Sequence, residues 1–176
     1  MAYANKSNAS MLSKQQVDRI AESIATQYGY NPETMDIESF VSQFGARINI
    51  EDDDAFYENE HGSCIVYGNK NFEILVPRST AALRDNFTIA HEFGHYVLHS
   101  KAGNNIPIND ALVFSRYGSD RLEWEANWFA AGLLMPKELF QQKMHDFNGN
   151  IFWLANYFNV STQAASYRAD YLGWDF

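Results

Sequence analysis

The spacing of hydrophobic positions divides the chain into helical ends and a strand-rich middle. Apolar residues recur every three to four positions over 13–28, which predicts an amphipathic helix that Gly29 ends. A second short helix is predicted over 36–41, and alternating apolar and polar positions over 46–50 predict a strand. Two β-prone runs follow at 63–67 and 72–76, and the turn-forming residues between them predict a hairpin.

The second half of the chain has a mainly helical pattern. Its predicted elements are a helix, a long loop with a short extended piece, a second helix and a helical C-terminal segment: 87–100, 101–119 (extended at 112–114), 120–134 and 137–176. The order helices, strands, helices favours an α+β fold. We expect a flexible tail over 1–12, one domain over 13–136, and a helical C-terminal subdomain over 137–176 that packs on it.

Composition narrows the class of protein. The chain has 176 residues, about one domain at roughly 150 residues each. Hydrophobic residues make up 46% and aromatic residues 15%, which is enough for a core and excludes a largely disordered chain. The formal net charge of −9 argues against a protein whose main task is to bind nucleic acid, because such proteins neutralise phosphates with Lys and Arg.

The single cysteine, Cys64, excludes an intramolecular disulfide and a cysteine-rich zinc site, and fits a reducing compartment. Because an apolar run follows it, we expect Cys64 to be a small buried hydrophobe rather than a nucleophile. The first twelve residues contain no secretory signal, and no run approaches 18 apolar residues. These observations favour the cytoplasm and give no reason to expect a membrane partner.

Three residues in the predicted helix 87–100 suggest metal chemistry. His91, Glu92 and His95 form the pattern H-E-x-x-H, in which both imidazoles lie on one face, about 6 Å apart along the axis. Glu92 can then address a water at an open position of the metal and accept its proton. The surrounding residues are mostly apolar, and burying these polar groups without a partner would be costly. The pattern therefore predicts a metal site.

A third ligand must come from elsewhere in the chain. His99 lies eight residues beyond His91, about 12 Å along the same helix, so it supports the site, faces substrate or is structural. The next long helix offers Glu123, with Asn127 one turn on as a hydrogen-bond partner for a ligand. Glu125 points about 160° away from Glu123 and is the alternative ligand. Two histidines and a carboxylate suit zinc, and manganese and iron stay open as alternatives.

The C-terminal segment 154–168 has the pattern of a helix-turn-helix, with Ser161 as the cap of its second helix. This pattern permits DNA binding. However, 161–176 contain one Arg and no Lys, so few phosphate contacts are available. Packing against the core or docking of a partner protein is the better interpretation.

Two long motifs carry a resemblance to a known family. Residues 87–99 (FTIAHEFGHYVLH) and 123–136 (EWEANWFAAGLLMP) resemble, in this order, the motifs of the ImmA/IrrE family of metallopeptidases. The resemblance implies a minimal gluzincin-like zinc peptidase fold, with a small sheet packed on the HExxH helix. It also implies a cytoplasmic enzyme that cleaves a helix-turn-helix repressor, often encoded nearby in mobile elements or stress regulons.

Carried over by position, the resemblance makes His91 and His95 zinc ligands and favours Glu123 as the third. Zinc-bound water would attack the peptide bond, with Glu92 as general base, and the strand at 63–67 or 72–76 would pair with the extended substrate. One alternative is a zinc-stabilised module that binds a repressor or antitoxin without cleaving it. Another is a DNA-binding regulator that uses the C-terminal helices.

Overall fold

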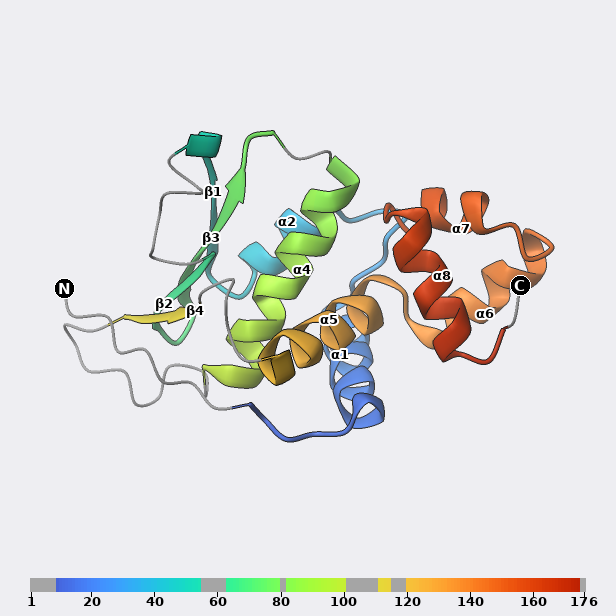
Figure 1. The fold of residues 1–176 in the computed structure, drawn as a ribbon, viewed down its shortest axis with the longest axis horizontal. Helices are drawn as coiled ribbons and strands as arrows, with labels where there is room; N and C mark the ends of the chain where they lie inside the picture. Colours follow the sequence, from blue (N-terminus) through green and yellow to red (C-terminus); the bar gives the residue numbers. More distant parts are fainter. Residues whose placement is uncertain (1–8, 55–62, 80–81, 101–110, 115–119, 175–176) are drawn as a thin grey trace.

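A computed structural model describes residues 9–54, 63–79, 82–100, 111–114 and 120–174. These contain seven helices and one four-stranded sheet (Figure 1). The elements are α1 (Lys14–Tyr28), α2 (Ile37–Ser42), β1 (Ala46–Glu51), β2 (Cys64–Gly68), β3 (Asn71–Pro77), α4 (Ala82–His99), β4 (Leu112–Phe114), α5 (Asp120–Leu134), α6 (Lys137–Asp146), α7 (Ile151–Tyr157) and α8 (Thr162–Tyr171). The predicted α+β class is confirmed.

Side-chain caps determine where several helices begin. Ser13 and Gln16 form a reciprocal capping box at the start of α1, and Gly29 ends that helix in the left-handed region at φ 71°. Asp36 accepts a hydrogen bond from the backbone N–H of Ser39 at the start of α2. By contrast, α4 begins five residues before the predicted start, because the polar stretch 84–86 interrupts the apolar periodicity.

The strands form one sheet in the order β1-β3-β2-β4. The predicted hairpin is present as the antiparallel pair β2 and β3, while β1 lies parallel to β3. β4 pairs antiparallel with β2. Among the described residues, β2 and β3 therefore have a neighbour on each side, and the prediction that 63–67 or 72–76 pairs with substrate is wrong. β1 and β4 are the edge strands.

One close backbone contact joins the start of β1 to the hairpin turn. Gly45 has φ 84°, and a Cβ atom there would lie 2.0 Å from the carbonyl oxygen of Lys70. The Lys70 N–H in turn donates to the hydroxyl of Tyr96 on α4, at 3.0 Å. Only glycine fits this position, and the contact fixes β1, the turn and α4 together.

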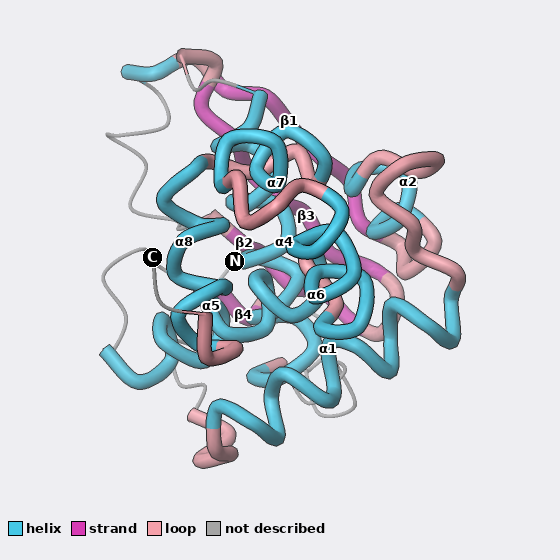
Figure 2. Tube along the Cα trace, turned by 90° about the vertical axis from the view of Figure 1, so that its right-hand side faces the viewer, coloured by secondary structure: helices cyan, strands magenta, loops and turns pink. Residues whose placement is uncertain are grey.

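The sheet lies on one side of α4, and the helices α1 and α5 lie on the other side (Figures 1 and 2). α4 packs on the sheet through Phe93 and Tyr96, which stack against Phe72 of β3. On its other side α4 meets α5, where a Cβ on Gly94 would lie 3.3 Å from the Cα of Ala126. As expected from the small residues on this face, the two helices approach closely.

The C-terminal helices are held to the core by a buried arginine. Arg168 of α8 donates to Asp18 at 2.5 Å and to Glu22 at 3.2 Å, both on α1, and to the carbonyl of Met135 at 2.9 Å. Its relative exposure is 2%. The one basic side chain in 161–176 is thus committed to an internal ion pair, which weighs against DNA binding by α8.

Cys64 lies on β2 with 0% relative exposure, as expected from the sequence. Burial, together with the nearby charge of Glu92, raises its pKa well above the usual range. We expect the native thiol to react with iodoacetamide roughly a hundredfold more slowly than the thiol in the urea-unfolded chain. Intact-mass spectra over time check this, and equal rates in both states would contradict the burial of β2.

None of the helices in the described part of the chain has the length and apolar character that a membrane crossing requires.

Candidate metal centre

Side chains from α4 and α5 converge at one point. The Nε2 atoms of His91 and His95 are 3.1 Å apart. Glu123 of α5 approaches both, with Oε2 3.2 Å from His91 Nε2 and Oε1 3.3 Å from His95 Nε2. One ligand atom from each of the three residues lies within 4.8 Å of the others, a spacing that could hold one metal ion.

The hydrogen bond on the far side of His91 determines which of its ring nitrogens faces the centre. The amide oxygen of Asn127 lies 2.9 Å from His91 Nδ1, and an amide oxygen only accepts, so Nδ1 donates. In the neutral ring Nε2 then carries no proton, and its lone pair points at other acceptors. Convergent acceptors without a donor between them are the arrangement that a cation satisfies.

The pKa values of His91 and Glu123 are both shifted by the charges around them. Burial by itself would lower the pKa of His91, but the adjacent carboxylates of Glu123 and Glu92 outweigh burial, so the pKa is raised. Burial by itself would raise the pKa of Glu123, but the adjacent imidazoles of His91 and His95 lower it to about 2. The carboxylates of the centre therefore favour a positive charge beside them, whether a proton or a metal ion.

Two buried carboxylate oxygens at the centre have no hydrogen-bond partner among the described residues. Glu92 has 4% relative exposure, and its Oε2 atom is one of them. The other is Glu123 Oε1, which faces His95 without hydrogen-bond geometry. Buried, unpaired carboxylate oxygens are costly, and a metal ion with its water would pair both.

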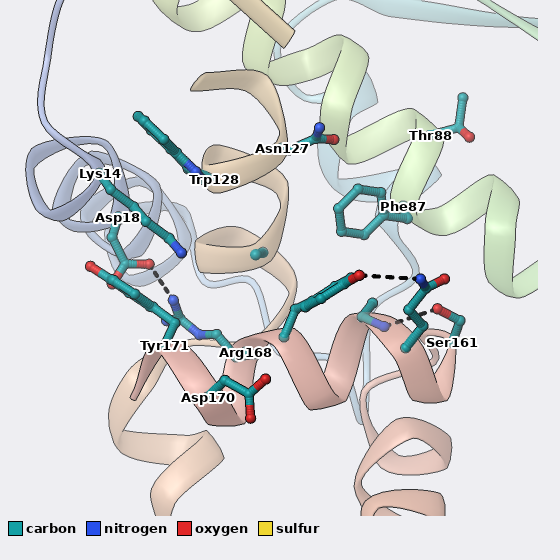
Figure 3. A pocket seen from close by; sticks show the side chains of 14 residues that line it. Lys14, Asp18, Phe87, Thr88, Asn127, Trp128, Ser161, Arg168, Asp170 and Tyr171 are labelled. Carbon is teal, nitrogen blue, oxygen red and sulfur yellow. Dashed lines mark hydrogen bonds and ion pairs between the residues drawn. The ribbon is translucent and has the colours of Figure 1, made fainter. Parts of the chain in front are cut away.

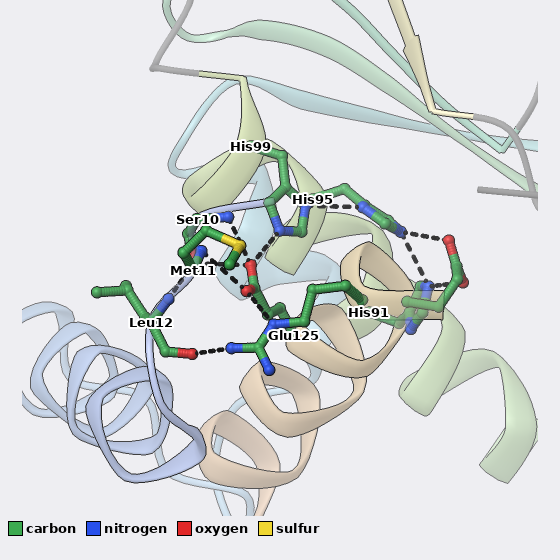
Figure 4. Close-up of polar contacts among 9 residues, drawn as sticks. Ser10, Met11, Leu12, His91, His95, His99 and Glu125 are labelled. Atoms are coloured by element: carbon green, nitrogen blue, oxygen red, sulfur yellow. Dashed lines mark hydrogen bonds and ion pairs between the residues drawn. The ribbon is translucent and has the colours of Figure 1, made fainter. Parts of the chain in front are cut away.

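Glu125, the alternative ligand, faces a different set of partners (Figure 4). Its Oε2 lies 3.0 Å from Nε2 of His99, and its Oε1 accepts from Nε of Arg121 at 2.8 Å. The other ring nitrogen of His99, Nδ1, is 3.0 Å from Nδ1 of His95. His99 thus contacts the candidate ligand His95 through Nδ1, the ring nitrogen that does not face the centre, and Glu125 contacts His99.

The residues before α1 complete this cluster, and sequence reasoning missed them. The backbone N–H and the hydroxyl of Ser10 donate to Glu125, and so does the N–H of Met11. Arg121 donates to the carbonyl of Leu12. Of the expected tail 1–12, these described residues are attached to α5, and 1–8 lie outside the described residues. A small polar residue before a helix gives no signal of such a contact.

A cleft of about 1020 Å³ opens between α1, α4, α5 and α8 (Figure 3). Aromatic side chains line it from several elements: Phe87, Trp128, Tyr167 and Tyr171. Asn127, which holds His91, also lines the cleft and connects it to the metal centre.

Comparison with known proteins adds an independent observation. Residues 41–170 match the model of the peptidase family Peptidase_M78, described as the IrrE N-terminal-like domain. The chain is also similar to the metallopeptidase ImmA of Bacillus subtilis (strain 168), with 31% identity over 88 residues. This match covers 49% of the chain and 50% of that protein, so the chain spans about half the length of this relative.

Proposed function

The chain belongs to the IrrE N-terminal-like family of peptidases, and from this premise we propose that it is a zinc-dependent endopeptidase. One observation supports this most strongly. His91, His95 and Glu123 converge within 4.8 Å, beside Glu92, whose buried Oε2 has no hydrogen-bond partner among the described residues. A site with only a structural role would have no use for this second carboxylate beside the three ligands.

We assign His91, His95 and Glu123 as the residues that would hold zinc. Two imidazoles and a carboxylate are a donor set that suits zinc, with one position left open in a catalytic site. When bound, zinc supplies Lewis acidity, which makes water a stronger acid and polarises a carbonyl. Glu92 would accept the proton of the attacking water and pass it to the leaving amine.

Two features support a polypeptide substrate. Phe114 of β4 stacks on the ring of His95 at a centroid distance of 5.0 Å, so the edge strand β4 lies directly beside the centre. Among the described residues, no strand covers the outer side of β4, where an extended peptide could add as a further strand. The aromatic cleft at Asn127 would accept apolar side chains of the same substrate.

We propose a helix-turn-helix repressor or antitoxin as the partner, following the family resemblance. The net charge of −9 supports a partner that is basic, as DNA-binding proteins are. A cytoplasmic setting agrees with the free, buried Cys64. The test is incubation of the zinc-loaded protein with the repressor encoded nearest to its gene, followed by mass spectrometry. One discrete cut supports the proposal, and an intact repressor contradicts this choice of substrate.

The two alternatives predict different results in the same assay. A zinc-stabilised binding module would retain the repressor on a column without cutting it. A DNA-binding regulator would shift duplex DNA at low salt, an outcome that the buried Arg168 disfavours.

Metal removal gives a prediction about stability. At a free zinc concentration of about 100 times Kd, binding stabilises the fold by about 2.7 kcal/mol. For a chain of this length that corresponds to a rise in Tm of roughly 5–10 °C. Differential scanning calorimetry with chelator and then with excess zinc measures it. His95→Ala should abolish the shift, and an equal shift in that variant would place the zinc elsewhere.

A further inference from the structure

We propose that His99 and Glu125 are positioning residues that orient His95 and hold its proton on Nδ1, so that a bare Nε2 faces the metal centre (Figure 4). The inference rests on the proposed metal site in that His95 is one of its ligands. Neither His99 nor Glu125 would touch the metal. They would act on it only through the ring of His95.

Hydrogen-bond donors surround both carboxylate oxygens of Glu125. Oε2 accepts from the backbone N–H of Ser10 at 2.8 Å and from its hydroxyl at 2.7 Å. Oε1 accepts from the N–H of Met11 at 3.1 Å and from Nε of Arg121 at 2.8 Å. Four donors and the guanidinium charge keep Glu125 an ionised carboxylate, which can only accept. His99 Nε2, 3.0 Å from Oε2, must therefore donate.

The burial of His99 determines which of its ring nitrogens carries a proton. The side chains of His99 and Glu125 both have 0% relative exposure, so no bulk water reaches their contact. Burial disfavours the charged form of His99, and the carboxylate that contacts His99 is already paired with Arg121. His99 is therefore neutral, with its one proton on Nε2 and a lone pair on Nδ1.

That lone pair determines the state of His95. His99 Nδ1 lies 3.0 Å from His95 Nδ1, and because the first is an acceptor, the second must be the donor. The neutral ring of His95 then has a bare Nε2, the atom that lies 3.3 Å from Glu123. Asn127 imposes the same state on His91. The two histidines of the motif are thus oriented by two separate hydrogen-bond systems.

The arrangement also explains the spacing Glu-x-Glu on α5. Residues two apart on a helix point about 160° apart, so Glu123 and Glu125 cannot both face the centre. One faces the metal ligands, and the other reaches His99 at the end of α4. The segment at Ser10 and Met11, more than 110 positions away in the sequence, closes the remaining side of Glu125.

The first test needs no variant. Long-range ¹H–¹⁵N spectra of the metal-free wild-type protein distinguish protonated from bare ring nitrogens. We expect His95 protonated on Nδ1 and His99 protonated on Nε2. A His95 ring protonated on Nε2 alone would overturn the proposal. This result does not depend on zinc or on cleavage, so it stands apart from any failure of the proposed function.

The second test compares metal affinity in variants. We expect His99→Phe and Glu125→Gln to bind zinc 10–100-fold more weakly than wild type, the usual effect of losing a group that supports a ligand. In Glu125→Gln the amide can donate to His99, so we also expect the Nε2-protonated form of His95 to increase. Competition with a chromophoric chelator measures the affinity. Glu138→Gln on the exposed first turn of α6 is the matched control.

The two proposals fail in different ways. Wild type that binds no zinc would contradict the proposed function and leave the proton positions to decide the inference. Variants that bind zinc as tightly as wild type, with His95 still protonated on Nδ1, would show that His99 and Glu125 serve only the fold. If His99→Phe does not fold, the wild-type spectrum and Glu125→Gln give the answer.

Discussion

Replacing Glu92 with glutamine is expected to lower the rate of peptide cleavage by roughly 10²–10⁴-fold while zinc content stays unchanged. The side chain keeps its shape but can no longer accept a proton from water. Glu92 is buried at 4% exposure, and its Oε2 has no hydrogen-bond partner among the described residues, so the substitution breaks no hydrogen bond of that atom there. Cleavage of a fluorogenic peptide that spans the repressor cut, together with metal analysis, measures both quantities.

The same substitution should leave the fold intact or slightly more stable, because it removes the charge of a buried carboxylate whose Oε2 has no hydrogen-bond partner among the described residues. Glu138→Gln on the surface of α6 changes the net charge equally and should cleave at the wild-type rate. Wild-type cleavage by Glu92→Gln would refute the assignment of the general base. Loss of zinc from it would instead mean that Glu92 holds the metal.

Replacing Arg168 with methionine should destabilise the protein by about 3–5 kcal/mol, the usual result of removing one partner from a buried ion pair. The substitution leaves Asp18, at 6% exposure, without its guanidinium partner, and leaves the carbonyl of Met135 without its donor. Urea unfolding followed by circular dichroism gives the change in free energy.

An exposed ion pair provides the control for this change. Arg78 lies 2.7 Å from Asp52, but both side chains are more than two-thirds exposed, at 68% and 77%. Arg78→Met should therefore change the stability by less than about 1 kcal/mol. If both variants lost the same free energy, burial would not explain the effect of Arg168. Adding Asp18→Asn to Arg168→Met should recover part of the loss, because the uncompensated charge is removed.

The sequence was most informative where local chemistry determines structure. Caps such as Ser13, Gly29 and Asp36 mark helix ends by hydrogen bonds within a few residues, so α1 and α2 could be predicted closely. The fixed spacing of His91 and His95 likewise places both imidazoles on one face of any helix. These signals do not depend on the rest of the fold.

Contacts between distant segments could not be predicted in this way. The parallel pairing of β1 with β3 and the pairing of β4 with β2 leave no local pattern, and together they make both β2 and β3 inner strands. One of the partners of Glu125 is a backbone segment more than 110 residues earlier in the chain. Spacing alone therefore left Glu123 and Glu125 as alternatives. The role of His99 stayed open for the same reason, since helix rise shows only which atoms it cannot reach.

The junction of Gly45, Lys70 and Tyr96 has a consequence for the order of folding events. β2 and β3 are adjacent in sequence and can form a hairpin in microseconds. β1 pairs in register with β3 across 26 positions, as Ala46 with Phe72, and must close a longer loop at greater entropic cost. Since the carbonyl of Lys70 contacts Gly45 only once the turn exists, we infer that β1 joins after the hairpin has docked on α4.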